Sequence, residues 1–209
     1  MSPWNIVAAL AAAVMLEGAQ GAIAQESGFV SHSELSVMGG AQALDQNDTA
    51  LPDHFVNVPV VGALAYHFSP NLAAEGEFAW VIPVKQSVDL GASGTQDRKT
   101  PDVLSYMANA RVSWPLSGWT PYLTGGLGAV TFLSTTGQDR VPQLSSSQTA
   151  FAIDMGAGVM VGLNAHWGLR GDFRSLAAFP AKDAPGLSSS GTADTIWMER
   201  VTAGLAYRF

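Results

Sequence analysis

Residues 197–209 read Trp197-Met198-Glu199-Arg200-Val201-Thr202-Ala203-Gly204-Leu205-Ala206-Tyr207-Arg208-Phe209, and their side chains alternate with a period of two. One face carries Trp197, Val201, Ala203, Leu205, Tyr207 and Phe209, and the other carries Arg200, Thr202, Gly204 and Arg208. A period of two is the side-chain period of a β-strand. The stretch therefore predicts a strand with an apolar outer face and arginines inside, as in a membrane barrel with lipid outside and a polar lumen within.

The first 24 residues have most features of a secretory signal peptide. Ile6 to Leu16 is an apolar run of eleven residues, which is too short to cross a bilayer as a helix. Ala22-Ile23-Ala24 then supplies a small-residue cleavage pattern before Gln25. The segment 1–5 departs from the pattern because it has no lysine or arginine. We expect a signal peptide at 1–24, rather than a structural segment, and one barrel domain at 25–209.

The composition excludes several classes of protein. The formal net charge is −7, and it becomes −6 without Glu17 of the leader, which argues against a nucleic-acid partner. The chain has no cysteine, so disulfides do not hold the fold. After the leader no apolar run reaches about 18 residues, so helical membrane spans are excluded. Hydrophobic residues make up 47% of the chain and charged residues only 13%, which fits an outer surface in contact with lipid.

Eight alternating segments follow the leader, separated by connections that are alternately long and short. We expect strands at 33–43, 56–68, 72–82, 103–114, 119–133, 149–163, 167–177 and 195–209. The short connections are Ser69-Pro70-Asn71, Pro115-Leu116-Ser117-Gly118 and Asn164-Ala165-His166, and the long ones cover 44–55, 83–102, 134–148 and 178–194. The pattern predicts an all-β fold: an eight-stranded antiparallel up-and-down transmembrane β-barrel with four long extracellular loops and short periplasmic turns.

Aromatic residues gather near both ends of these segments. Those by the short turns are Phe68, Trp114, Trp119, Tyr122, Trp167, Tyr207 and Phe209, and those nearer the long loops are Phe55, Trp80, Tyr106, Phe132, Phe151, Phe173 and Trp197. We expect two girdles at the membrane boundaries. The alternative is a soluble barrel whose aromatic residues fill its core. The sequence argues against this alternative, because the polar face carries many charges without a matching apolar interior. Pro59 predicts a bulge or a later strand start.

Three stretches resemble a known family. They are Pro121-Tyr122-Leu123-Thr124-Gly125-Gly126-Leu127-Gly128, Trp167-Gly168-Leu169-Arg170-Gly171-Asp172-Phe173-Arg174 and Gly204-Leu205-Ala206-Tyr207-Arg208-Phe209. With the strand pattern they resemble the OmpA-like family of small outer-membrane barrels, which includes the OmpX-type proteins. The resemblance implies a place in the outer membrane of a Gram-negative cell, among its lipid and lipopolysaccharide. It also implies that Tyr207 and Phe209 form a signal read by the barrel-assembly machinery. Activity is poorly specified, because the family includes adhesins and structural anchors.

The charges on the predicted inner face balance. Five are acidic and five are basic: Glu34, Glu75, Glu77, Asp154 and Asp172 against Arg111, Arg170, Arg174, Arg200 and Arg208. Arginine suits such positions because its planar fork holds carboxylates bidentately and stays charged. An eight-stranded barrel is only wide enough for its own side chains. The pattern therefore predicts an internal salt-bridge network that largely fills the lumen, and the alternative is a narrow charged pore for ions or small solutes.

Enzymatic and metal-binding interpretations have little support. Some small barrels hydrolyse acyl chains of lipid A with a Ser/His pair on the outer rim. Here only His54 lies at the expected extracellular end, and it has no well-placed serine partner within its strand. The other histidines are His32, His67 and His166; we expect all four to be interfacial or loop residues, too scattered for a metal site. Glu75 and Glu77 suit acid/base chemistry or a lumen ladder, and we favour the ladder. No cofactor is predicted.

The long loops are the remaining place for function. They are rich in aspartate, and binding and adhesion are commonly carried by loops on a rigid scaffold. Acidic loops can bridge to divalent cations between lipopolysaccharide phosphates, or stay solvated, and we favour solvation. The sequence thus predicts a non-enzymatic surface, structural or adhesion-type envelope protein whose loops are available to an extracellular ligand. The alternatives are the narrow pore and a lipid-modifying barrel enzyme.

Overall fold

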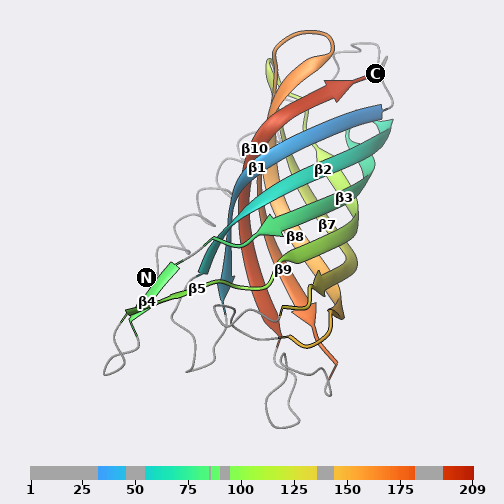
Figure 1. The fold of residues 1–209 in the computed structure, drawn as a ribbon. Coiled ribbons are helices and arrows are strands. Elements are labelled where there is room, and N and C mark those ends of the chain that lie inside the picture. Colours follow the sequence, from blue (N-terminus) through green and yellow to red (C-terminus); the bar gives the residue numbers. More distant parts are fainter. Residues whose placement is uncertain (1–32, 46–54, 85, 90–94, 136–143, 182–194) are drawn as a thin grey trace, which may run out of the picture.

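The computed structural model describes residues 33–45, 55–84, 86–89, 95–135, 144–181 and 195–209. Eight strands close into an antiparallel barrel in the order β1-β10-β9-β8-β7-β6-β3-β2 (Figure 1). They are β1 (Ser33–Asp45), β2 (Phe55–Ser69), β3 (Leu72–Ile82), β6 (Val103–Ser113), β7 (Trp119–Phe132), β8 (Gln148–Gly162), β9 (Trp167–Phe179) and β10 (Ile196–Arg208). The predicted eight-stranded all-β fold is confirmed. The expected signal peptide, His32 and His54 lie outside the described residues.

One connection contains structure that the sequence did not predict. Within the expected loop 83–102, β4 (Gln86–Asp89) and β5 (Thr95–Arg98) pair as a separate two-stranded sheet. Each of these strands is only four residues long. Four residues are too few for an alternating pattern to stand out from a polar loop.

Pro59 lies inside β2 without the predicted bulge or later strand start. The register of β2 against β3 is continuous through Pro59, and its shift falls between His67 and Ser69. On the other side of β2, the pairing with β1 is interrupted between Gly39 and Gln42. Proline has no N–H to donate to a ladder, so the barrel accommodates it by losing cross-strand pairs rather than by bulging.

The two ends of the barrel differ in their connections. The short turns and the C-terminus lie together at the top of Figure 1, and the strand ends that lead into the longer connections lie at the opposite end. Asn164 Oδ1 accepts from the backbone N–H groups of His166 and Trp167, at 2.9 Å each, and Gly118 has a φ of 87°. The hydrogen bonds of Asn164 and the positive φ of Gly118 are features of tight turns. That the short turns face the periplasm stays a prediction.

The outer face of the barrel is apolar. In β3 exposed and buried residues alternate along the whole strand, with Phe78 and Trp80 outside and Glu75 and Glu77 inside. The same alternation places Val201 and Leu205 of β10 outside. An apolar exterior with charges inside is the inverse of a soluble protein and suits a lipid solvent. Among the described residues, no helix is long and apolar enough to cross a membrane.

Two aromatic residues expected in the girdles point inward instead. Tyr122 and Phe132, both on β7, are only 1% and 2% exposed. The glycines at 125, 126 and 128 hide the phase of this strand in the sequence, because glycine fits either face. The ring of Tyr122 occupies space beside the inward-facing Gly158, where an added Cβ would collide with it. The side chain of Phe55 lies outside the described residues.

The lumen is divided into two halves along the barrel axis. The half toward the short turns, here the charged half, holds the ten charged residues predicted for the lumen. The half toward the long connections, here the apolar half, is filled by one cluster: Leu44, Val81, Val103, Met107, Val130, Phe132, Leu144, Ala150, Ala152, Leu176, Ala178, Ile196 and Met198. The sequence-based argument that no apolar interior exists is therefore wrong for this half.

Candidate functional site

The charged half is built from alternate residues on six strands. β9 contributes Arg170, Asp172 and Arg174 at consecutive inward positions, and β3 contributes Glu75 and Glu77 in the same way. The others come from β1, β6, β8 and β10, and are Glu34, Arg111, Asp154, Arg200 and Arg208. Because side chains alternate along a strand, a spacing of two directs each set to one face. Nine of the ten residues are buried, and Arg208 is the partly exposed one.

Arg174 occupies the centre of the network and contacts four carboxylates. Its Nη2 lies 2.5 Å from Glu75 Oε1 and 3.2 Å from Glu77 Oε2. Its Nη1 lies 2.9 Å from Asp154 Oδ2, and its Nε donates to Asp172 Oδ1 at 2.9 Å. The planar guanidinium has donors on every side except its stem. This one side chain therefore connects β9 to β3 and β8 across the lumen.

Glu75 is the carboxylate that three arginines share. Arg170 holds it bidentately, with Nη1 2.7 Å from Oε2 and Nη2 3.1 Å from Oε1. Arg111 Nη1 donates to Oε2 at 3.1 Å, and Arg174 donates to Oε1. A buried carboxylate loses its hydration, and only several charge-assisted hydrogen bonds replace it. Glu75 thus joins the central arginine to those nearer the short turns.

Glu34 closes the network at the short-turn end. It accepts from Arg111 Nη1 at 3.0 Å and lies 3.4 Å from Nε of Arg208. His67 belongs to this group, because its Nε2 lies 2.9 Å from Arg111 Nη2 and 3.6 Å from Glu34 Oε2. The expectation that His67 is an interfacial or loop residue is wrong. An arginine N–H can only donate, so Nε2 accepts in this contact.

The network ends toward the apolar half at Arg200. Its Nη2 pairs with Glu77 Oε1. Within the described part of the chain, Nε and Nη1 of Arg200 have no hydrogen-bond partner. Through Glu77 and Arg174, Arg200 is connected to all the other charges. The ten residues therefore form one continuous set of ion pairs from Arg208 to Arg200.

Tyr122 is a member of the site that sequence reasoning missed. Its hydroxyl donates to Asp172 Oδ2 at 2.6 Å and accepts from Arg170 Nε at 2.8 Å. The guanidinium carbons of Arg111 and Arg170 lie 5.2 Å and 5.1 Å from its ring centroid, which is within cation–π range. The aromatic ring thus fills space between two arginines of like charge. A regular alternation of apolar and polar residues along β7 would have placed Tyr122 on the inner face, but the glycines of this strand hide that alternation.

Residues from two long connections are buried at the other end of the lumen. Leu144, between β7 and β8, is fully buried in the apolar half, and its carbonyl accepts from Thr135 N at 2.8 Å. Thr100, before β6, is buried and donates its hydroxyl to Asn57 Oδ1 at 3.2 Å. The buried side chain of Leu144 and the bond from Thr100 to Asn57 fasten these two connections to the barrel. Side chains therefore occupy the lumen at both ends.

The C-terminal aromatic residues lie outside this network, at the short-turn end. The ring centroids of Tyr207 and Phe209 are 5.2 Å apart, and Tyr207 lies 4.9 Å from Trp167. Phe209 N donates to Ser33 O at 3.1 Å, so the last residue still touches the first strand. Trp167 and Phe209 are exposed on the outer face, and Tyr207 between them is half-buried. Its role as an assembly signal stays a prediction.

The carboxylates of the charged half are held in ion pairs, which cross-link the strands, and are not left free for acid/base chemistry. Glu75 and Glu77, which the sequence offers as an acid/base pair, both bind arginines. Among the described residues, no group of three histidine, cysteine or acidic side chains is placed to hold a metal ion. The geometry provides fixed, mutually neutralised charges in a narrow lumen.

The fold and its inverted polarity define a class, the transmembrane β-barrels. Residues 7–209 match the family model described as outer membrane protein beta-barrel domain. The chain belongs to this family and is an outer-membrane β-barrel. A search of curated proteins finds no match.

Two solved structures illustrate the similarity of fold. Neisserial surface protein A is 12% identical with a TM-score of 0.56, covering 85% of this chain and 97% of its own. The N-terminal barrel domain of Pseudomonas aeruginosa OprF is 10% identical with a TM-score of 0.51, covering 86% of this chain and 98% of its own. At these identities the likeness concerns the fold alone.

Proposed function

We propose that this protein is a non-enzymatic surface or structural protein of the outer membrane, with a lumen closed to ions and solutes. The observation that carries the proposal is the continuous network from Arg208 to Arg200, with the apolar half packed next to it on the side of the long connections. An eight-stranded barrel has room for its own side chains and little else. The barrel then acts as a rigid membrane anchor for its long connections.

The energetics of the network support a plug over a pore. A conducting path requires water and ions to replace arginine–carboxylate contacts such as those of Arg174. Removing one partner of a buried ion pair costs about 3–5 kcal/mol, because the other charge is left buried. The apolar half adds a second barrier, since an ion there loses its hydration without gaining a partner. Both halves oppose conduction by different means.

Planar-bilayer conductance tests the closed lumen. The mature chain, residues 25–209, is refolded in detergent, its folding is shown by a heat-dependent gel shift, and a porin serves as positive control. We expect no steady channels from the folded barrel. Steady conductance that falls when Arg111 or Glu77 is replaced would instead establish the narrow pore.

The proposed surface role depends on the long connections facing outward. We expect protease added to intact cells to cut within 83–102 or 178–194 and to spare the short turns. Cleavage at these sites only after the outer membrane is opened would show that the long connections face the periplasm. If the long connections face outward, their aspartate-rich sequences are available to an extracellular ligand, as in an adhesion-type protein.

The lipid-modifying alternative has its own test. We expect the mass of lipid A to be unchanged in cells that express the protein. A changed mass that His54→Ala abolishes would make the protein an enzyme and overturn the proposal.

A further inference from the structure

The apolar outer wall carries a charged side chain, that of Glu199 on β10. Its neighbours in sequence, Met198 and Arg200, are buried in the lumen, so the alternation along the strand turns Glu199 outward. Among the outward-facing residues of the eight barrel strands whose side chains the structure describes, Glu199 is the only charged one. An ionisable side chain on a lipid-facing wall costs free energy, so a partner for it is expected there.

Ser175 on β9 lies directly beside Glu199. The two residues are register partners, and both are half-buried on the outer face. Within the described part of the chain, neither side chain makes a hydrogen bond or an ion pair. A serine hydroxyl can donate a hydrogen bond, and a carboxylate can only accept one. The wall therefore presents an unused donor next to an unused acceptor.

A row of small residues crosses the same side of the barrel, two outward steps from Glu199 toward the short turns. Ala203 of β10 has Gly39 of β1 on one side and Gly171 of β9 on the other. The backbone does not require these glycines, because a Cβ built at Gly39 or Gly171 comes no closer than 3.7 Å to another heavy atom. In a membrane, small residues allow a second protein to approach closely, which strengthens van der Waals packing.

A second copy of this chain fits this face. In a two-fold dimer the same patch meets itself, so β9 of one copy lies against β10 of the other. The register pairs of these strands then recur between the copies, as Ser175 with Glu199, Phe173 with Val201 and Gly171 with Ala203. Each donor meets an acceptor, and the small residues meet each other.

We propose that the outer face of β9 and β10 is the interface of a two-fold homodimer in the outer membrane. Ser175 of each copy donates a hydrogen bond to Glu199 of the other copy. The two carboxylates lie on a diagonal of the interface, one outward step from the exposed Trp197 at the long-connection end. Tryptophan prefers the headgroup region, where a charge costs less than at the bilayer centre.

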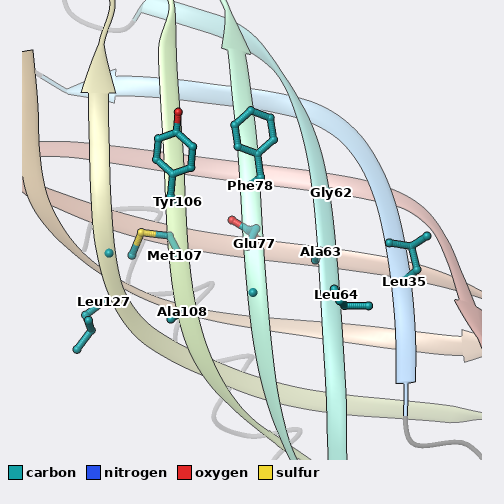
Figure 2. A pocket seen from close by; sticks show the side chains of 12 residues that line it. Leu35, Gly62, Ala63, Leu64, Glu77, Phe78, Tyr106, Met107, Ala108 and Leu127 are labelled. Atoms are coloured by element: carbon teal, nitrogen blue, oxygen red, sulfur yellow. The ribbon is translucent and has the colours of Figure 1, made fainter. Parts of the chain in front are cut away.

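Cross-linking in the membrane tests the interface, since the chain has no cysteine of its own. Ala203→Cys places a thiol near the two-fold axis. The control is Ala108→Cys on β6, four strands from β10 in either direction around the barrel. Ala108 lies on an apolar outer face beside the exposed Phe78 and Tyr106 (Figure 2).

With a short thiol-to-thiol cross-linker at low protein density, we expect about tenfold more dimer from Ala203→Cys than from Ala108→Cys. Equal yields from the two positions would overturn the proposal. Each variant is first shown to fold by its heat-dependent gel shift. Ala41→Cys, on the exposed face of β1, replaces Ala203→Cys if the latter does not fold.

Substitutions added to the cysteine variant identify the bonds between the copies. Ser175→Ala removes both donors and should lower the dimer yield about fivefold. Ser175→Glu sets carboxylate against carboxylate and should abolish the dimer. Combining Ser175→Glu with Glu199→Ser exchanges the two groups and should restore the yield, because each donor again faces an acceptor. Glu199→Gln keeps an acceptor and should retain the dimer.

Two results with these variants would overturn the proposal. One is a folded double variant that does not regain cross-linking. The other is a loss of cross-linking in Glu199→Gln while Ser175→Ala has no effect. That result would mean that the charge of Glu199 binds a cation or a basic partner instead of the serine of a second copy.

Discussion

The two halves of the lumen fill the same narrow space by different means. In the charged half, Arg174 alone contacts four carboxylates on three strands. In the apolar half, Leu176, two residues further along the same strand β9, is buried among aliphatic and aromatic neighbours. One strand thus changes from ion pairing to hydrophobic packing within a single inward step.

The difference shows where the specificity of this fold lies. The outer wall is apolar, so apolar side chains such as those around Leu176 suit either face of the sheet. Charged side chains on the lipid face are costly, and a one-residue slip in register would place them there. The ion pairs join residues far apart in sequence, such as Glu75 and Arg174. The charged half therefore fixes which face is inside, and the apolar half adds packing.

Arg174→Met is the substitution expected to damage the charged half most. It leaves Asp154, Asp172 and Glu77 with fewer partners in a buried site, and we expect a loss of about 3–5 kcal/mol in the free energy of unfolding. Urea titration followed by tryptophan fluorescence measures it. Arg200→Met, which removes contact with one carboxylate, is the control and should lose less. An equal loss in Arg174→Met and Arg200→Met would contradict the central position of Arg174 in the network.

Leu176→Ala tests the apolar half. Truncating a buried leucine leaves a cavity and costs about 2–4 kcal/mol, and the same urea titration measures this. Combined with Arg208→Met, at the far end of the network, its effect should be nearly additive if the two halves are independent. A strong coupling between them would contradict the division of the lumen.

Tyr122→Phe removes a hydroxyl and keeps the ring between Arg111 and Arg170. Asp172 loses a donor and Arg170 Nε loses an acceptor, so we expect a loss of about 1–2 kcal/mol. The unfolding titration should show this loss with an unchanged slope. If the free energy of unfolding does not change measurably, Tyr122 stabilises the barrel through its ring alone.

Arg208→Met should have the smallest effect of the four. Its side chain is 40% exposed and pairs with Glu34 at 3.4 Å, and solvent weakens such a pair to below about 1 kcal/mol. Glu34 keeps its contact with the buried Arg111. A loss as large as that of Arg174→Met would mean that the short-turn end, not the centre, holds the network together.

The sequence predicted the barrel because lipid imposes a period-two pattern that is easy to read in strands such as β3 and β10. It placed all ten charged residues on the inner face for the same reason. It misplaced Tyr122 and Phe132 because the glycines of β7 carry no phase information. The sequence-based prediction missed the apolar half because it assigned charges to the inner or outer face only. It did not consider where along the barrel axis each inward charge lies. The partners of His67 and Arg174 depend on strand order and stagger, which no local pattern shows.

Cysteine accessibility tests the closed lumen most directly, since the chain has no cysteine of its own. Ser36→Cys probes the charged half, Ser105→Cys the apolar half, and Ser117→Cys an exposed short turn. The account predicts that a small water-soluble thiol reagent labels both lumen positions about 100-fold more slowly than the turn, because labelling requires local opening. Labelling of either lumen position at a rate close to that of the turn would show a water-filled path and contradict the account.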